Sequence, residues 1–122
     1  MKKIEMLKII LENNKMLDCY HVGIRSESDI KYFNEFDDLS DETIESEGFF
    51  VYPDFSKEDY KKALNNGIIK VYSSKPFKLG NFISTSKMMA LDYAGNGKIY
   101  SKIVKIDEIA WISPEEGQVI EV

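Results

Sequence analysis

Five short segments rich in β-branched and aromatic residues fill the second half of the chain. They read GIIKVYSS from Gly67, GNFIS from Gly80, KIYSKIVKI from Lys98, IAWIS from Ile109 and QVIEV from Gln118. Except at KMMALDYA, where the periodicity becomes helical, the turns between them are too short for crossover helices. Strands connected so closely pair in the antiparallel direction. The pattern therefore predicts a mostly antiparallel sheet.

Helical patterns come earlier in the chain. Apolar residues recur at helical spacing from Lys2 to about Asn14, which predicts an amphipathic helix. Ser56 and Asp59 form a capping-box pattern before a second helix that ends at NNG. MLDCYHVGI, residues 16–24, suits a buried strand, and SDETIESEG, residues 40–48, suits a capped helix or a mobile loop. Helices followed by strands predict an α+β domain.

Length and composition limit the remaining possibilities. The 122 residues, 43% of them hydrophobic, predict one domain over residues 1–122. A net charge of -5 argues against a surface that neutralises nucleic-acid phosphates or anionic lipid, although a local basic strip remains compatible with it. Charges interrupt the N-terminal apolar residues, so we expect a cytoplasmic protein without a membrane partner. A single cysteine, Cys19, and a single histidine, His21, predict neither an internal disulfide nor a metal site.

Hydroxyl side chains stand where a strand runs into a helix. Ser84, Thr85 and Ser86 could cap that helix, which is their more usual role, or could hold a phosphate with its free N–H groups. Tyr93, seven residues after Ser86, could pack into the core or present its ring at the edge of a cleft.

Two other stretches contain candidate site residues. His21 could be a structural, hydrogen-bonded residue or a binding residue, and Gly23 beside it would let a ligand approach the backbone closely. Arg25 could bind a phosphate or pair with the acidic segment that follows. In the tail SPEEGQVIEV, Glu115 and its neighbours suit a solvated turn before a final strand.

The order of these motifs resembles the ADP-ribosyltransferase superfamily over residues 19–122. YHVG comes first, then FISTS running into a helix with ALDYA, then IYSKIVKIDEIAWI, and finally EEGQVI. In that family the first strand carries an Arg or His, matched by His21, and one branch has an S-T-S motif, matched by Ser84 to Ser86. The other branch uses a tyrosine, for which Tyr93 is the candidate. The resemblance implies a split antiparallel sheet with NAD held in the cleft between its halves.

The resemblance also implies roles for these residues. His21, with Gly23 and Arg25, would position the adenosine ribose and the phosphates. Tyr93 would stack on the nicotinamide, and the Ser84-Thr85-Ser86 motif would fix the cofactor amide or the neighbouring strands. A carboxylate at the last strand would stabilise the positive charge that develops on the ribose.

The acidic position departs from the family pattern E-x-E-V-I/L. Alignment places Gln118 at the usual catalytic glutamate, with Glu116 two residues before it. Three interpretations stay open: Glu116 or Glu121 acts in a shifted register, Gln118 supports a slower transfer, or the domain binds NAD or ADP-ribose without turnover. Glu116 ranks above Glu121, because strand alternation would turn Glu121 to the opposite face.

The expected function is that of an NAD-dependent mono-ADP-ribosyltransferase. Its small size suggests a toxin or a phage effector of the anti-CRISPR type, with a protein target expected ahead of a nucleic acid. The alternative is a catalytically inactive protein of the same fold that binds or inhibits a partner with the acidic residues 37–47. A third interpretation, an RNA 2'-phosphotransferase-like enzyme, would need several basic residues along the site.

Overall fold

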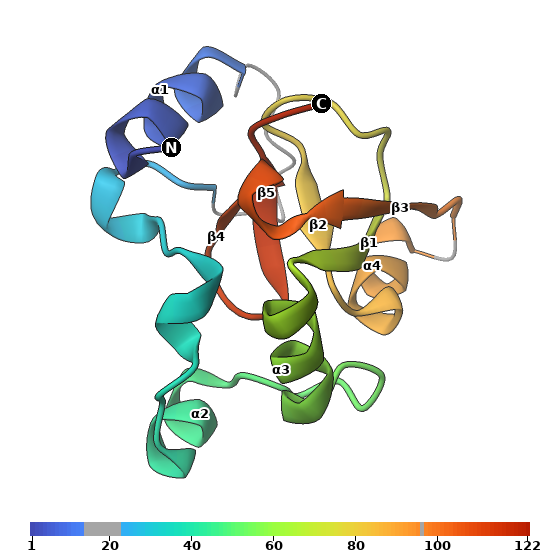
Figure 1. The fold of residues 1–122 in the computed structure, drawn as a ribbon. Helices are drawn as coiled ribbons and strands as arrows, with labels where there is room; N and C mark the ends of the chain where they lie inside the picture. Colours follow the sequence, from blue (N-terminus) through green and yellow to red (C-terminus); the bar gives the residue numbers. More distant parts are fainter. Residues whose placement is uncertain (14–22, 96) are drawn as a thin grey trace.

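The computed structural model describes residues 1–13, 23–95 and 97–122 (Figure 1). Its α-helices are α1 (Lys3–Asn13), α2 (Asp41–Glu47), α3 (Lys57–Asn66) and α4 (Lys87–Ala94). Its strands are β1 (Ile68–Ser73), β2 (Phe82–Ser84), β3 (Tyr100–Lys105), β4 (Ile109–Trp111) and β5 (Glu116–Val119). Three 3-10 turns complete the regular structure, at Glu27–Asp29, Phe33–Phe36 and Ile106–Glu108. The predicted α+β class is confirmed.

Capping residues fix where the helices begin and end. The Ser56 Oγ atom accepts from the Asp59 N–H at 3.2 Å, and the Asp59 carboxylate accepts from the Ser56 N–H at 2.9 Å, so the predicted capping box of α3 is confirmed. Gly67 ends α3 with a φ of 73°, a conformation that favours glycine. Ser40 caps α2, which shows that the segment is a helix and not a loop.

All five strands pair in the antiparallel direction, in the order β3-β1-β2-β5-β4. Six residue pairs join β1 to β3, from Ile68↔Lys105 to Ser73↔Tyr100. A single pair, Tyr72↔Ser84, joins β1 to β2. The described strands therefore form one continuous sheet with a narrow seam between β1 and β2, and its predicted division into two halves around a cleft stays a prediction.

The last strand differs from its predicted position. The sequence pattern placed it at residues 118–122, but β5 begins at Glu116 and ends at Val119. The cause is pairing with β2, which aligns Ser84 with Glu116 and Phe82 with Gln118. Glu121 lies beyond the strand and is exposed.

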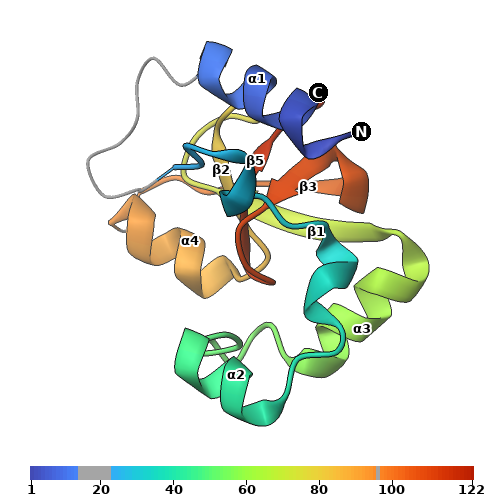
Figure 2. The ribbon, with the colours of Figure 1, turned by 90° about the vertical axis from the view of Figure 1, so that its left-hand side faces the viewer.

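Two hydrophobic cores lie on opposite faces of the sheet. Val71, Ile83 and Val119 face a core that also contains residues of α3 and of the turn Phe33–Phe36. On the other face α1 packs its apolar side against Ala110 of β4. In both views α1 lies on one side of the sheet, and α2 and α3 lie on the other (Figures 1 and 2).

The remaining helix and the start of the described middle segment complete the fold. α4 packs against β1 and β2, beside the seam. The predicted strand over residues 16–24 lies largely outside the described residues, and Gly23 and Ile24, which are described, are buried but belong to no strand. None of the helices in the described part of the chain has both the length and the apolar composition that crossing a membrane requires.

Candidate functional site

A small hollow lies at the seam of the sheet. Its volume is about 20 Å³, enough for roughly one water molecule. Its walls include Tyr72 of β1, Ser84 of β2, Glu116 of β5 and Tyr93 of α4. Because Ser84 pairs directly with both Tyr72 and Glu116, these three side chains project from the same face of the sheet. The structure thus brings together three of the predicted site residues, Ser84, Tyr93 and Glu116.

Glu116 is a half-buried residue whose carboxyl-bearing side chain lines this hollow. Burial raises its pKa, and the neighbouring carboxyl of Glu115 raises it further. The pKa of the Tyr93 hydroxyl is also raised, first by burial and then by the charges of Glu116 and Asp92. Near neutral pH the Tyr93 hydroxyl therefore keeps its proton, and the residue is 38% exposed.

Gln118 lies two residues further along β5 and is fully buried. Its Oε1 atom accepts from the Ile24 N–H at 2.7 Å, and its Nε2 atom donates to the Gly80 carbonyl at 2.8 Å. The side chain thereby ties the segment at Gly23 to the loop before β2. A role for Gln118 at a ribose stays a prediction.

Ser84 and Thr85 hold the turn between β2 and α4. The Ser84 Oγ atom accepts from the Ser86 N–H at 3.0 Å. The Thr85 hydroxyl donates to the Pro114 carbonyl at 3.2 Å, and the Thr85 N–H donates to the Glu115 carbonyl at 2.9 Å. Both side chains are buried, and their contacts fix the turn against the loop before β5.

Ser86 is the N-cap of α4, which is the more usual of the two roles considered from the sequence. Its Oγ atom accepts from the Met89 N–H at 3.0 Å and donates to the Asp54 carboxylate at 2.7 Å. Asp54 also accepts from the Met88 N–H at 3.1 Å. A carboxylate thus occupies the N-terminus of α4, where the helix dipole favours an anion, and a phosphate would have to compete with it.

The role of Asp54 could not be predicted from the sequence. The residue lies in the loop before α3, 32 residues before Ser86, and no spacing or motif links the two positions. Pro53 and Asp54 read as an ordinary turn.

Glu115 is buried, which corrects the expectation of a solvated turn. Only 2% of it is exposed, and its Oε1 atom accepts from the Phe50 N–H at 2.8 Å. Burial raises the pKa of Glu115, while the backbone N–H groups of Phe50 and Val51 partly offset that effect. Phe50 adopts a φ of 58°, which is unusual for a bulky residue. The carboxyl therefore anchors a strained loop beside the hollow.

A larger and more open hollow of about 510 Å³ adjoins the first, and Tyr93 belongs to the walls of both. Tyr52 and Asp92 line the larger hollow. The Tyr52 hydroxyl donates to the Asp92 carboxylate at 2.7 Å, and this bond, together with burial, raises the pKa of Tyr52 to about 12.

The other predicted binding residues lie elsewhere. Gly23 is buried and Arg25 is exposed, and neither is among the described residues that line the small hollow. The Arg25 N–H donates to the Asp29 carboxylate at 3.0 Å. His21 and Cys19 lie outside the described residues.

Within the described ranges, no three His, Cys, Asp or Glu side chains are grouped so that they could hold a metal ion. No family model matches the chain, and no curated protein or solved structure matches it either. The functional argument therefore depends on the residues and their geometry.

Proposed function

We propose that the chain is an NAD-dependent mono-ADP-ribosyltransferase that acts on a macromolecular target. The observation that carries this proposal is the convergence of Ser84, Tyr93 and Glu116 on one hollow. The three residues come from β2, α4 and β5. Each matches a different motif of the ADP-ribosyltransferase superfamily, which the chain resembles.

The chemistry assigns a role to each of the three residues. Transfer breaks the bond between the ribose C1′ atom and the nicotinamide nitrogen, and the electron pair leaves with nicotinamide. The Glu116 carboxylate accepts a hydrogen bond from a ribose hydroxyl and stabilises the positive charge that develops on the sugar. This effect is stronger in a partly buried site than in water. The acceptor then bonds to C1′ and releases its proton.

Tyr93 and Ser84 support this step. Tyr93 is partly exposed, and its ring offers a face on which the nicotinamide can stack. Ser84 keeps the turn into α4 in place through its bond to the Ser86 N–H, so that Tyr93 and Glu116 stay opposite each other.

The side chains that line the small hollow suit NAD, but the hollow has to widen before it can admit the nicotinamide and its ribose. Its volume of about 20 Å³ is far below that of a nicotinamide ring. Tyr93 is the natural moving part, because it lines both hollows. Rotation of its side chain would join the hollow at Glu116 to the larger one at Tyr52.

Transfer from labelled NAD in a cell lysate tests the proposal. We expect Glu116→Gln to reduce labelling by about 100-fold or more, the usual effect of removing one group that stabilises a transition state. Glu121→Gln is the matched control, because Glu121 is exposed and lies outside the hollow. Neither labelling nor nicotinamide release with the wild-type protein would overturn the proposal.

A second candidate is an inhibitor that acts through its acidic surface without turnover. It is favoured by the solvent exposure of the acidic side chains of residues 37–47. Reversing the charges of Asp37, Asp38, Asp41 and Glu42 would then abolish function, while His21→Ala would not. The transferase predicts the opposite pattern.

A further inference from the structure

Positive and negative charges are separated along the chain. Residues 60–106 contain nine lysines and one acidic residue, Asp92, whereas residues 26–59 contain twelve acidic residues and two lysines. All nine lysines are exposed. They are Lys61, Lys62, Lys70, Lys75, Lys78, Lys87, Lys98, Lys102 and Lys105. The net charge of -5 therefore conceals a strongly basic region.

Part of this basic region forms a flat surface on β1 and β3. Ile68, Lys70 and Tyr72 pair directly with Lys105, Ile103 and Ser101, so these six side chains share one face of the sheet. We call this surface the lysine face. Ile68 is 50% exposed and Ile103 is 65% exposed, which shows that the lysine face is open to solvent.

Aromatic rings accompany the lysines. On the lysine face, the Lys70 Nζ atom lies 5.7 Å from the centre of the Tyr72 ring. A second such contact, 4.8 Å from the Lys98 Nζ atom to the centre of the Tyr100 ring, lies on the other face of β3, because Tyr100 pairs with the buried Ser73. Both ion pairs found within the described ranges involve other lysines, Lys3 and Lys57.

Protection of a sheet edge explains only some of these lysines. Lysines on an edge strand such as β3 hinder pairing with other chains. However, Lys70 lies on β1, which is paired on both sides. Edge protection also gives no reason for the exposed Ile68 and Ile103 beside it. A surface that joins cations to apolar and aromatic groups is typical of a binding face.

We propose that the lysine face binds single-stranded nucleic acid without sequence preference. Its cations are all lysines, which contact phosphates as point charges and lack the planar fork with which arginine reads guanine. The Tyr72 ring, Ile68 and Ile103 offer apolar contacts to unpaired bases. Binding of this kind does not depend on the proposed transferase activity.

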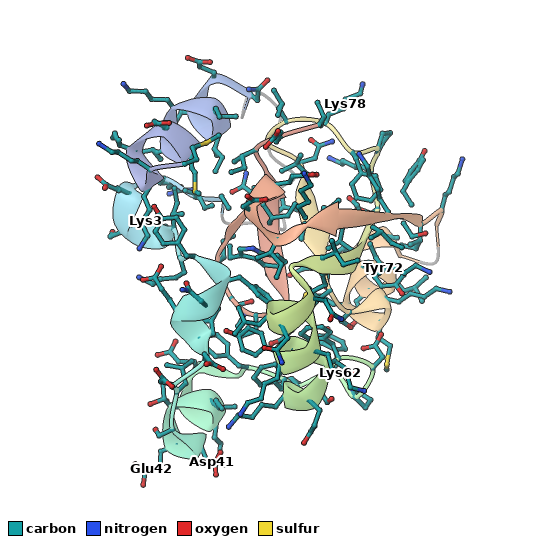
Figure 3. The ribbon with its side chains drawn as sticks, in the orientation of Figure 1. Lys3, Asp41, Glu42, Lys62, Tyr72 and Lys78 are labelled. Atoms are coloured by element: carbon teal, nitrogen blue, oxygen red, sulfur yellow. The ribbon has the colours of Figure 1, made fainter. Side chains whose placement is uncertain are left out.

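Asp41 and Glu42 of the acidic segment lie away from this surface (Figure 3), whereas Glu116 shares its face of the sheet beyond Ser84. Figure 3 places Asp41 and Glu42 at the lower end of the molecule, and Tyr72 of the lysine face at its right side. Repulsion between exposed charges is screened over about 10 Å at moderate salt, so the acidic end leaves the lysine face attractive to phosphates. Tyr72 also lines the small hollow. A bound strand would therefore pass directly beside the candidate active site.

Fluorescence anisotropy with labelled 20-nucleotide oligo(U) and oligo(dT) tests the proposal. We expect the wild-type protein to bind both oligonucleotides at about 50 mM salt. The logarithm of its binding constant should fall linearly with the logarithm of the salt concentration. In the double variant Lys70→Gln/Lys105→Gln, the slope of this plot should be smaller in magnitude by about 1.4. Each phosphate contact to a single strand contributes about 0.7 to the slope, and the variant loses two such contacts. Its affinity should fall by about 10-fold or more.

The matched control is Lys2→Gln/Lys8→Gln, which removes the same charge from exposed positions near and on α1. It should bind as the wild type does. Equal losses in the two double variants, or no oligonucleotide binding by the wild type, would overturn the proposal. Binding to polyglutamate or to phosphatidylserine vesicles without binding to oligonucleotides would also overturn it, in favour of an acidic protein or a lipid surface. Circular dichroism of each variant checks that the fold is retained, and NAD labelling tests the transferase separately.

Discussion

The α3 face of the sheet and the β2–β5 region of the opposite face are built from different kinds of residue. On the α3 face, the Phe33 ring packs at a tilt against Trp111 and Tyr60 with ring centres 4.5 and 4.6 Å apart, within an apolar core. On the opposite face, at β2 and β5, Ser84 and Gln118 are buried and Glu116 is half-buried. Buried polar groups lower stability unless each finds a partner. Apolar packing supports both faces, under α3 and under α1, so the comparison favours a functional origin for the polar groups at β2 and β5.

Trp111→Ala should produce the largest effect, because it opens a cavity in the α3 face. We expect a loss of about 3–5 kcal/mol in the free energy of unfolding, measured by urea denaturation. The hydrogen bond from Trp111 Nε1 to the Ile106 carbonyl is lost as well. Ile103→Ala, at a site that is 65% exposed, is the control and should change stability by about 0.5 kcal/mol or less. Similar losses in the two variants would show that Trp111 does not anchor this core.

Gln118→Leu, among the polar groups at β2 and β5, should produce an intermediate effect. The substitution keeps a side chain of similar size but leaves the Ile24 N–H and the Gly80 carbonyl without the Gln118 amide. Each buried group left unpaired costs about 1–3 kcal/mol, and we expect a total loss of about 2–4 kcal/mol in urea denaturation. An unchanged midpoint would mean that these hydrogen bonds contribute little and that the two regions differ less than their residues suggest.

Glu116→Gln should have the smallest effect on stability, and that effect should depend on pH. The folded protein raises the pKa of Glu116 above its ordinary value of 4.5, so the folded state holds this proton more tightly than the unfolded chain does. Wild-type stability therefore falls as the pH rises from about 4.5 through the raised pKa. Glutamine does not ionise, and the variant should lose less stability over this range.

Thermal unfolding of the wild type and of Glu116→Gln across this pH range provides the measurement. Glu121→Gln, at an exposed position, should follow the wild-type profile. Superimposable profiles for Glu116→Gln and the wild type would contradict the direction of the pKa shift.

Most of the fold could be predicted from local patterns. The caps at Ser56 and Gly67 bound α3 because a helix end depends on residues close together in the sequence. The start of β5 could not be predicted in this way. Glu116 and Gly117 read as a turn, and their place in the strand depends on pairing with Ser84 and Ile83 of β2.

The residues of the candidate site also differ in whether the sequence alone could identify them. Ser84, Tyr93 and Glu116 could be named from the order of motifs, and the structure brings them to one hollow. Asp54 and Glu115 could not be named, because their partners Ser86 and Phe50 lie 32 and 65 residues away. Partners at such distances leave no periodic signal in the sequence.

The strands of the sheet are not held together equally, because β1 and β2 share far fewer pairs than β1 and β3. Besides the single pair Tyr72↔Ser84, the seam between β1 and β2 is held by the Ser73 hydroxyl, which donates to the Phe82 carbonyl at 2.7 Å. The ladder between β1 and β3 has six pairs and resists bending as a unit. We therefore expect any change in the curl of the sheet to concentrate at the seam, where the fewest strand pairs have to be altered. The hollow lies at this seam, so such a change would alter its width while the longer ladder stays intact.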